Sequence, residues 1–412
     1  MRNYESVVID LYADWNATSG VFGKLESGFK WDTLYVPENA RITLNMNGHT
    51  INRGLTEDRA DGEVIYIDKS ACVVISGGNI TGGFSNNGAG GIHVCDGANL
   101  TLKDVNVIGN AVKGDDGAGI ALYNGAVLNM EGGSISGNHM EYQHVYAPFI
   151  SSLLNIYPYG SLYVNNATAI LSKVAISNNS AGQYSAEGVA IYATGSSLIL
   201  NECVISGNAL RTDTTAYATS VIAAYSSKLM IQNTEFTNNA SNDISYNSDG
   251  ARHPLLFYFE DSIITIDGGK ITGNNARELF EFNETDANIT GVTITDNTSL
   301  VANVKNDAKK VIFTDCTLGN NSPTIDYKEF RVENKDTLVM KNCNLGDTTF
   351  ENKNMVDGVG SIFGEGSLTM IVSILALVVG GAAIFMNVYS KKKVLAGAAA
   401  EETEDADEAT EE

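Results

Sequence analysis

Basic residues and prolines are both scarce in this chain. Lysine and arginine together number 26, against 49 aspartates and glutamates in 412 residues, for a formal net charge of −23. Because nucleic acids bind to clustered Lys and Arg, this balance argues against a nucleic-acid partner. The chain has 5 prolines but 41 glycines, and such a composition favours many turns and few kinks.

Cysteine is sparse as well, and the spacing of the five cysteines does not resemble a zinc site. Cys203, Cys316 and Cys343 share one position of an internal repeat, where the simplest prediction is a small buried hydrophobic residue. Cys316 and Cys343 fall on consecutive repeats, so a disulfide between them is the alternative. The sequence also lacks a Gly-rich phosphate loop and a recognisable Ser-His-Asp arrangement.

The internal repeat accounts for most of the length. One copy has an anchor at Val107, apolar residues seven, five and two positions before it (Leu100, Leu102 and Val105), and Asn110 three positions after it. The same template fits eleven anchors: Ile51, Ile80, Val107, Ile135, Ile176, Ile205, Phe236, Ile271, Ile294, Leu318 and Leu345. Successive anchors lie 23 to 41 residues apart, which is the period range of solenoid proteins.

Each repeat consists of two short alternating runs with one extra residue between them. Alternation predicts strands with one buried face, and the extra residue marks a bend between two faces. An asparagine follows the anchor by three positions in eight of the eleven repeats. Asparagine tolerates the left-handed conformation of a tight turn, and stacked asparagines can form a hydrogen-bonded ladder.

This pattern resembles the right-handed parallel β-helix. Blocks such as Gly90-Gly91-Ile92-His93-Val94, alternating with ends such as Phe236-Thr237-Asn238-Asn239, are similar to the repeats of polymorphic outer-membrane and adhesin-like proteins with the pectin-lyase-like fold. We therefore expect an all-β fold of about eleven coils over residues 42–348, preceded by an N-terminal cap at residues 1–41. In that cap, Val7, Val8 and Trp15 are expected to pack over the first coil.

The C-terminal part predicts a membrane anchor. After a linker at residues 349–366, residues 367–390 form an uncharged apolar segment, and Leu368 to Tyr389 is long enough to cross a bilayer as a helix. Lys391, Lys392 and Lys393 follow it, which places the C-terminal end in the cytoplasm and the β-helix outside. The tail at residues 391–412 turns from basic to strongly acidic and is expected to be disordered.

The start of the chain conflicts with this location, because Met1 leads into the cap without the apolar region of a secretory signal. Two explanations stay open. Either the natural chain begins elsewhere, or the protein is tail-anchored and faces the cytosol. The lysine placement and the resemblance to surface proteins favour a single-pass cell-membrane protein with its β-helix outside.

Two enlarged repeats carry many aromatic residues, around residues 142–163 and 246–259. Insertions in solenoids commonly form a binding face, and exposed rings can stack on sugars or anchor a protein. Tyr142, Tyr146, Phe149 and Tyr157 are the predicted ligand-binding residues, for an extracellular glycan or protein. The alternative is that the rings of both insertions fold back and pack on the rod.

Catalysis finds little support in the sequence. The resemblance includes polysaccharide lyases and hydrolases, which carry acids or bases on neighbouring coils, and hydrolases need two carboxylates roughly 5–9 Å apart. Asp104 and Glu131 fall one coil apart, as do Glu202 and Glu235, and neither pair is joined by a third acid. Asp104 and Glu131 are the weak catalytic candidates, with surface charge as the simpler interpretation. No cofactor or metal is predicted. The leading hypothesis is therefore an adhesin-like binding protein, with a β-helix enzyme and a structural surface spacer as alternatives.

Overall fold

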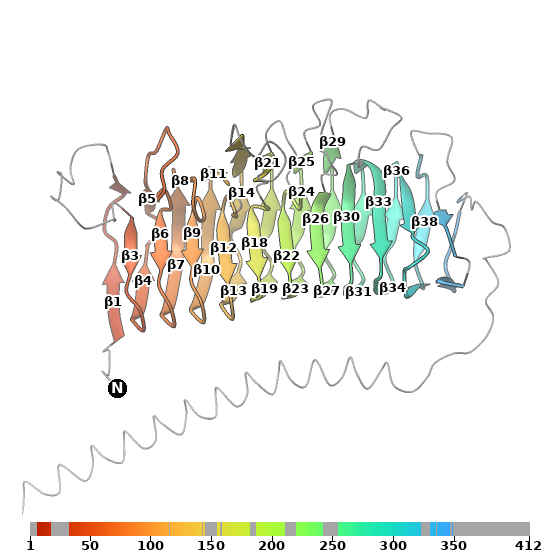
Figure 1. The fold of residues 1–412 in the computed structure, drawn as a ribbon, viewed down its shortest axis with the longest axis horizontal. Helices are drawn as coiled ribbons and strands as arrows, with labels where there is room; N and C mark the ends of the chain where they lie inside the picture. The colour runs from red at the N-terminus through yellow and green to blue at the C-terminus, as the bar shows by residue number, and fades with distance from the viewer. Residues whose placement is uncertain are drawn as a thin grey trace, which may run out of the picture. The chain divides into compact units, whose positions relative to one another are not determined.

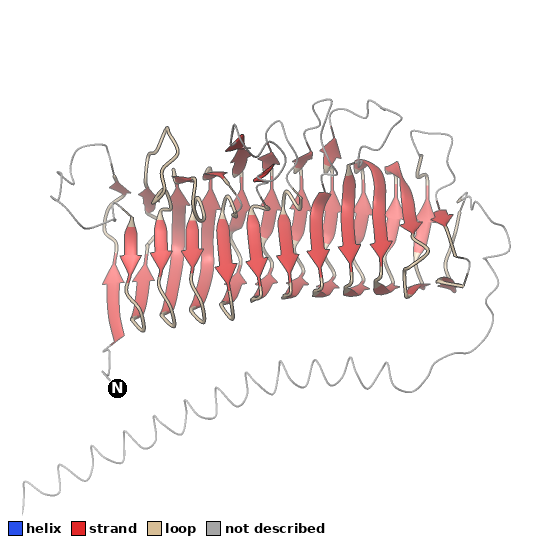
Figure 2. Cartoon of the chain, viewed as in Figure 1, coloured by secondary structure: helices blue, strands red, loops and turns tan. Residues whose placement is uncertain are grey.

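The computed structural model describes most of the repeat region. The described residues are 6–17, 33–114, 116–141, 143–144, 155–156, 159–181, 187–210, 220–241, 254–322, 330–334, 336–346 and 348. All of them belong to the first of two compact units, Met1–Gly358 and Val359–Glu412. Throughout these residues the regular structure is strand, which confirms the all-β prediction for this part of the chain (Figure 2). None of them belongs to a helix that could cross a membrane. The predicted segment at residues 367–390 lies outside the described residues.

The strands stack in four columns that form two parallel sheets (Figure 1). The first sheet has 21 strands. Its first column contains β1 (Ser6–Asp10), β4 (Arg41–Asn45), β7 (Cys72–Thr81), β10 (Asn99–Ile108), β13 (Val127–Glu131), β19 (Thr168–Ser172), β23 (Ser197–Asn201), β27 (Lys228–Gln232), β31 (Ile263–Asp267), β34 (Asp286–Thr290), β37 (Lys310–Thr314) and β40 (Leu338–Lys341). Its second column, which holds the anchors, shares β7 and β10 and adds β2 (Trp15–Asn16), β5 (Thr50–Asn52), β14 (Ser134–Ser136), β20 (Ala175–Ser177), β24 (Val204–Ser206), β28 (Glu235–Thr237), β32 (Lys270–Thr272), β35 (Thr293–Thr295) and β38 (Thr317–Gly319).

The second sheet has 17 strands in the remaining two columns. The third column contains β8 (Phe84–Ser85), β11 (Ala111–Lys113), β15 (His139–Glu141), β21 (Ser180–Ala181), β25 (Ala209–Leu210), β29 (Ala240–Ser241), β33 (Asn275–Asn283) and β36 (Thr298–Val304). The fourth column shares β33 and β36 and adds β3 (Leu34–Val36), β6 (Ile65–Ile67), β9 (Ile92–Val94), β12 (Ile120–Tyr123), β18 (Leu162–Asn165), β22 (Ile191–Thr194), β26 (Ser220–Tyr225), β30 (Leu255–Glu260) and β39 (Phe330–Val332). A separate antiparallel pair joins β16 (Gln143–His144) to β17 (Asn155–Ile156).

The registers confirm the repeat template. Each anchor from Ile51 to Leu318 pairs in parallel with the next anchor along the chain. Leu345 follows Asn344, which bridges to Thr317 and so continues the same register. The anchors on either side of the two enlarged repeats therefore stay in register with each other. The resulting architecture is a parallel β-helix.

The N-terminal segment extends the stack, whereas the sequence predicted that it would cover the first coil. Strand β1 pairs with β4, and Trp15 pairs with Ile51 as though it were a further anchor. Val7 and Val8 are 50% and 61% exposed, so they do not pack over the first coil, whereas Trp15 packs against the apolar core as predicted. The physical reason is that an alternating run beside an unpaired strand edge gains more backbone hydrogen bonds as another rung than as a lid.

The asparagine ladder is present and complete over eight rungs. Asn110, Asn138, Asn179, Asn208, Asn239, Asn274, Asn297 and Asn321 are all buried. Along the ladder, each side-chain amide donates to the Oδ1 of the next asparagine at 2.9–3.2 Å. Each amide also donates to the carbonyl oxygen of the anchor one rung earlier, as Asn208 does to Ile176 at 3.0 Å. The ladder thus satisfies backbone groups that the turn leaves without a strand partner.

The ladder asparagines were predicted to adopt the left-handed conformation of a tight turn, and this prediction is wrong, because none of them has a positive φ. Positive φ values occur one residue earlier, as at Asn178 (φ 55°) and Asn238 (φ 54°). They also occur at the bend three residues before the anchor, as at Asp104 (φ 51°) and Lys173 (φ 57°). The ladder position needs a side-chain amide, while its neighbour needs a backbone that tolerates positive φ.

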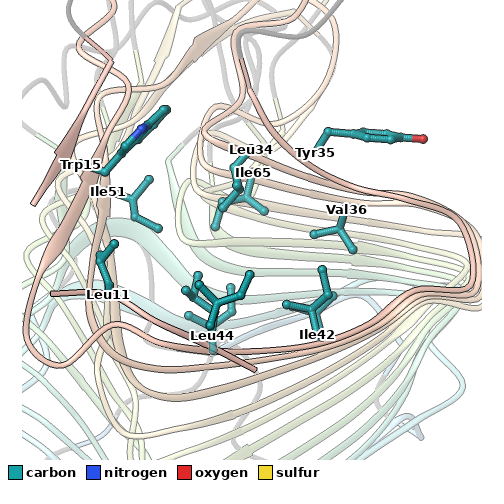
Figure 3. Close-up of a pocket in the computed structure, with 12 residues that line it drawn as sticks. Leu11, Trp15, Leu34, Tyr35, Val36, Ile42, Leu44, Ile51 and Ile65 are labelled. Atoms are coloured by element: carbon teal, nitrogen blue, oxygen red, sulfur yellow. The ribbon is translucent and has the colours of Figure 1, made fainter. Parts of the chain in front are cut away.

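An apolar interior runs along the whole stack, and aromatic rings fill its C-terminal half. Phe257 and Phe280 lie parallel with centroids 4.7 Å apart and planes 6° apart. Phe282 stacks on Phe280 at 5.5 Å, and Phe313 packs edge-on at 6.3 Å. At the other end, an apolar cavity of about 230 Å³ lies between the first rungs. Figure 3 shows Trp15, Ile51 and Leu44 at this cavity, while the ring of Tyr35 points away from it.

Candidate functional site

The two predicted catalytic carboxylates do not form a site. Asp104 is exposed and occupies the left-handed bend of its rung. Glu131 is exposed at the end of β13 and pairs with Lys103, so Asp104 stands beside Gly132 instead. The requirement for a bend therefore accounts for the position of Asp104, and Glu131 ends a surface strand.

The predicted ligand-binding residues Tyr142, Tyr146, Phe149 and Tyr157 lie outside the described residues. For the aromatic residues at the end of the second insertion, the prediction of an exposed binding face is wrong. Phe257 and Phe259 point into the core from β30 and are fully buried, and Tyr258 is only 7% exposed. Successive residues of a strand point to opposite faces, so Phe257 and Phe259 pack inside the β-helix and Tyr258 packs against Tyr225 on its outer face.

A row of aromatic side chains covers the outer face of the fourth column. The centroids of Tyr35 and Tyr66 lie 5.8 Å apart, Tyr66 and His93 4.7 Å, and His93 and Tyr123 4.7 Å. The row continues through Tyr163, Tyr192, Tyr225 and Tyr258 at 5.3–5.8 Å. The parallel register produces this row, because outward residues at the same strand position stack on consecutive rungs.

Among the eight rungs from β3 to β30, two have alanine at this position and the other six have an aromatic ring. Ala121 pairs with His93 and Tyr163, and the ring of Tyr123, two residues later on β12, takes its place in the row. Ala223 and Tyr225 repeat the arrangement on β26. The small side chain leaves space that the neighbouring tyrosine fills, so the row stays continuous.

Carboxylates accompany the tyrosine hydroxyls. Tyr35 donates to Asp68 at 2.5 Å, and Tyr225 donates to Glu187 at 2.6 Å. Tyr123 donates to Asp116, which also accepts a hydrogen bond from the backbone N–H of Gly88 at 2.8 Å. Because the ring faces stack on one another, the row presents mainly ring edges, hydroxyls and carboxylates.

Beside the N-terminal half of this row lies a polar cavity of about 660 Å³. We call it the Glu63 cavity, and its lining residues are Ala60, Asp61, Glu63, Tyr66, Asn87, Gly88, His93, Asp116 and Tyr123. Three consecutive fourth-column strands, β6, β9 and β12, supply its aromatic wall (Figure 1). The segments that enter these strands supply the carboxyl groups.

Buried contacts hold Glu63 at the back of this cavity. Arg53 is 1% exposed and donates from Nη1 to the backbone oxygen of Glu63 at 2.5 Å. Gly62 lies against the backbone of Phe84, where an added Cβ would come within 1.8 Å of the carbonyl oxygen. Glycine is therefore required for the close approach that turns Glu63 inward.

Two buried polar atoms in the Glu63 cavity have no hydrogen-bond partner in the described structure, namely Oε2 of Glu63 and Nδ1 of His93. Burial raises the pKa of Glu63 to about 7 and lowers the pKa of His93 to about 4. Burial also raises the pKa of Asp116. Buried polar groups are normally paired, so these atoms indicate a place where a ligand supplies the missing partners.

The ionisation of Glu63 predicts a pH dependence of stability. Its pKa is raised in the folded state, so its favourable contribution is complete below the unfolded value of 4.5 and is lost as pH rises through about 7. As pH rises through this range, the free energy of unfolding of Glu63→Gln should increase by on the order of 2–3 kcal/mol relative to that of wild type. Urea unfolding of both proteins at pH 4.5 and pH 8 measures this gain. If the difference in free energy of unfolding between the two proteins is the same at both pH values, the burial of Glu63 is contradicted. His93 has the opposite pH trend, but its contribution cancels because both proteins contain it.

Among the residues that the structure describes, no group of three or more His, Cys, Asp or Glu side chains could hold a metal ion. The carboxyl, imidazole and hydroxyl groups of the Glu63 cavity can instead exchange hydrogen bonds and protons with a polar organic ligand. Sequence reasoning identified the strand that contains His93 but missed the cavity. The available signal was the outward alternation of Tyr66 and His93 on strands of known period.

Comparisons with known proteins find no match to this chain among protein-family models, curated proteins or solved structures.

Proposed function

We propose that this chain is a cell-surface β-helix protein that binds an extracellular glycan in the Glu63 cavity. The observation that carries the proposal is the presence of two buried, unpartnered polar atoms, on Glu63 and His93, at one cavity wall. A sugar hydroxyl donates and accepts hydrogen bonds, so a glycan can satisfy both atoms at once. Such pairing recovers the cost of leaving a buried polar group unsatisfied, roughly 1–3 kcal/mol for each.

The charges of the cavity favour a neutral or amine-bearing sugar over a uronic acid. Asp61, Glu63 and Asp116 are its ionisable acids, and Arg59 pairs with Asp61 at 3.4 Å. The neutral form of His93 adds no positive charge at neutral pH. With the chain at −23 overall, a polyuronate would meet repulsion both at the cavity and at long range.

The wider assignment rests on the sequence. The resemblance of the repeats to right-handed pectin-lyase-like surface proteins supports the location outside the cell, and Leu368 to Tyr389 would supply the anchor. Tyr142, Tyr146, Phe149 and Tyr157 stay predicted ligand contacts. A β-helix hydrolase is the second candidate, because Glu63, a carboxylic acid with a pKa of about 7, lines the same cavity as the carboxyl group of Asp116, and such a group suits general acid catalysis.

A binding assay on the full-length chain tests the proposal. Neutral glucan, partly deacetylated chitin oligomers and polygalacturonate are offered in turn, and both retention and new reducing ends are measured. We expect retention of a neutral or amino glycan without cleavage. The double variant Glu63→Gln/Asp116→Asn should bind at least about tenfold more weakly, because its amides cannot carry a negative charge and a hydrogen bond to a charged group contributes about 1.5–3 kcal/mol.

Glu131→Gln is the matched control, because Glu131 is an exposed acid on a different column. Equal binding by wild type and the double variant, or equal losses in the double variant and in Glu131→Gln, would contradict the cavity assignment. New reducing ends that disappear in the double variant would establish the hydrolase. Failure to retain any glycan would leave the spacer hypothesis ahead.

A further inference from the structure

Cys316 and Cys343 occupy the same inward corner on two consecutive rungs. Cys316 immediately precedes β38, and Cys343 immediately precedes Asn344, which bridges in parallel to Thr317. The backbone N–H of Asn344 donates to the carbonyl oxygen of Cys316 at 2.8 Å. These contacts set the two cysteines side by side in register, at the C-terminal end of the described stack.

The spacing of the rungs suits a covalent bond between them. Neighbouring parallel strands lie roughly 4.8 Å apart. Disulfides span Cα–Cα distances of about 4.4–6.8 Å. Both residues are thiols in this structure. The two sulfur atoms make equivalent contacts, Cys316 with the carbonyl oxygen of Thr314 and Cys343 with that of Lys341, each at 3.4 Å. Because Thr314 and Lys341 pair in register, the two side chains project in the same direction.

We propose that Cys316 and Cys343 form a reversible disulfide that fastens the last two described rungs of the β-helix. The oxidant is a low-molecular-weight disulfide, RSSR. The thiolate of Cys343 attacks one sulfur of RSSR and releases one RSH, giving a mixed disulfide. The sulfur of Cys316 then attacks the Cys343 sulfur and releases the second RSH. Two protein thiols are oxidised, RSSR is reduced to two thiols, and the two protein protons end on the released RSH molecules.

The different environments of the two thiols decide this order. Cys316 is 1% exposed, whereas Cys343 is partly exposed and can meet an external reagent. The interaction of the two neighbouring thiols lowers the pKa of Cys343 and raises the pKa of Cys316. Since the thiolate is the nucleophile, Cys343 reacts first and Cys316 resolves the mixed disulfide.

The chain contains its own control for this geometry. Cys203 occupies the same corner on an earlier rung, where Val174 and Thr234 are its neighbours. It has no cysteine on either adjacent rung, so it cannot form the same bond. Val292 fills this corner on the rung before Cys316, which makes Cys316→Val a substitution that the fold accommodates.

The test counts thiols in the full-length, folded chain after incubation with oxidised glutathione. Free thiols are then alkylated under denaturing conditions and measured by mass. We expect wild type to fall from five free thiols to three, with the Cys316 and Cys343 peptides joined. Cys203→Val should form the same link, and Cys316→Val should instead retain a glutathione adduct on Cys343.

Two results would overturn the proposal. One is wild-type protein that keeps all five thiols under conditions in which Cys316→Val accepts glutathione at Cys343. The other is wild-type protein in which the adduct on Cys343 persists without a link to Cys316. Reversal of the link by a reducing agent, with recovery of five free thiols, would complete the support.

Discussion

Phe280→Ala is expected to lower the free energy of unfolding by about 3–5 kcal/mol. Phe280 is fully buried on β33, and its ring touches Phe257 face to face and Phe313 edge to face. Its neighbour on the following rung is Ala302, which is too small to fill the space that the ring would leave. The loss therefore combines the burial free energy of the removed ring, the cost of the cavity left behind, and the lost aromatic pairing of roughly 0.5–1.5 kcal/mol.

Urea unfolding followed by circular dichroism and by hydrogen exchange measures this change. Because each rung of a solenoid contacts only its neighbours, protection should fall most on β30, β33 and β36. Ile263→Ala is the matched control, since Ile263 lies on the same stack but is 38% exposed. A loss below about 1 kcal/mol for Phe280→Ala, or an equal loss for Ile263→Ala, would show that the stacked rings do not dominate this core.

Asn208→Ala is expected to lower the free energy of unfolding by about 2–4 kcal/mol, although it removes only a small polar side chain. Oδ1 of Asn208 accepts from the backbone N–H of Asn179 at 3.2 Å and from its side-chain amide at 2.9 Å. Nδ2 of Asn208 donates to the oxygen of Ile176 at 3.0 Å and to Oδ1 of Asn239 at 2.9 Å. Without that side chain, these buried groups lose partners that water cannot replace.

The control for the ladder is Asn129→Ala, because Asn129 is exposed on β13 and lies outside the ladder. That change should stay within about 0.5 kcal/mol of wild type. Asn208→Leu restores volume but no hydrogen bonds, so it should remain destabilised as well. Recovery of stability in Asn208→Leu would mean that packing, and not the hydrogen-bonded ladder, supports the turn.

Periodic features of this protein were readable from its sequence. The alternation around Val107, Ile135 and Ile176 predicted the stacked anchors, and the asparagine spacing predicted the ladder. Both depend on a local pattern of residues that recurs in each repeat, so the structure inferred for one repeat holds for the others. The same logic placed Cys203 and Cys316 in the buried corner.

The tertiary structure decided which side chains meet between rungs. Glu63, His93 and Asp116 line one cavity because loops of unequal length return to strands in register, and loop paths carry no period that the sequence displays. The addition of Trp15 to the stack was likewise decided by hydrogen bonding at a strand edge, since an apolar run can either cover that edge or extend it. The sequence by itself thus determined the repeat and its interior, because burial and turn geometry recur on each rung. Only the fold determined the Glu63 cavity and the N-terminal rung, because both depend on contacts between segments with no common pattern.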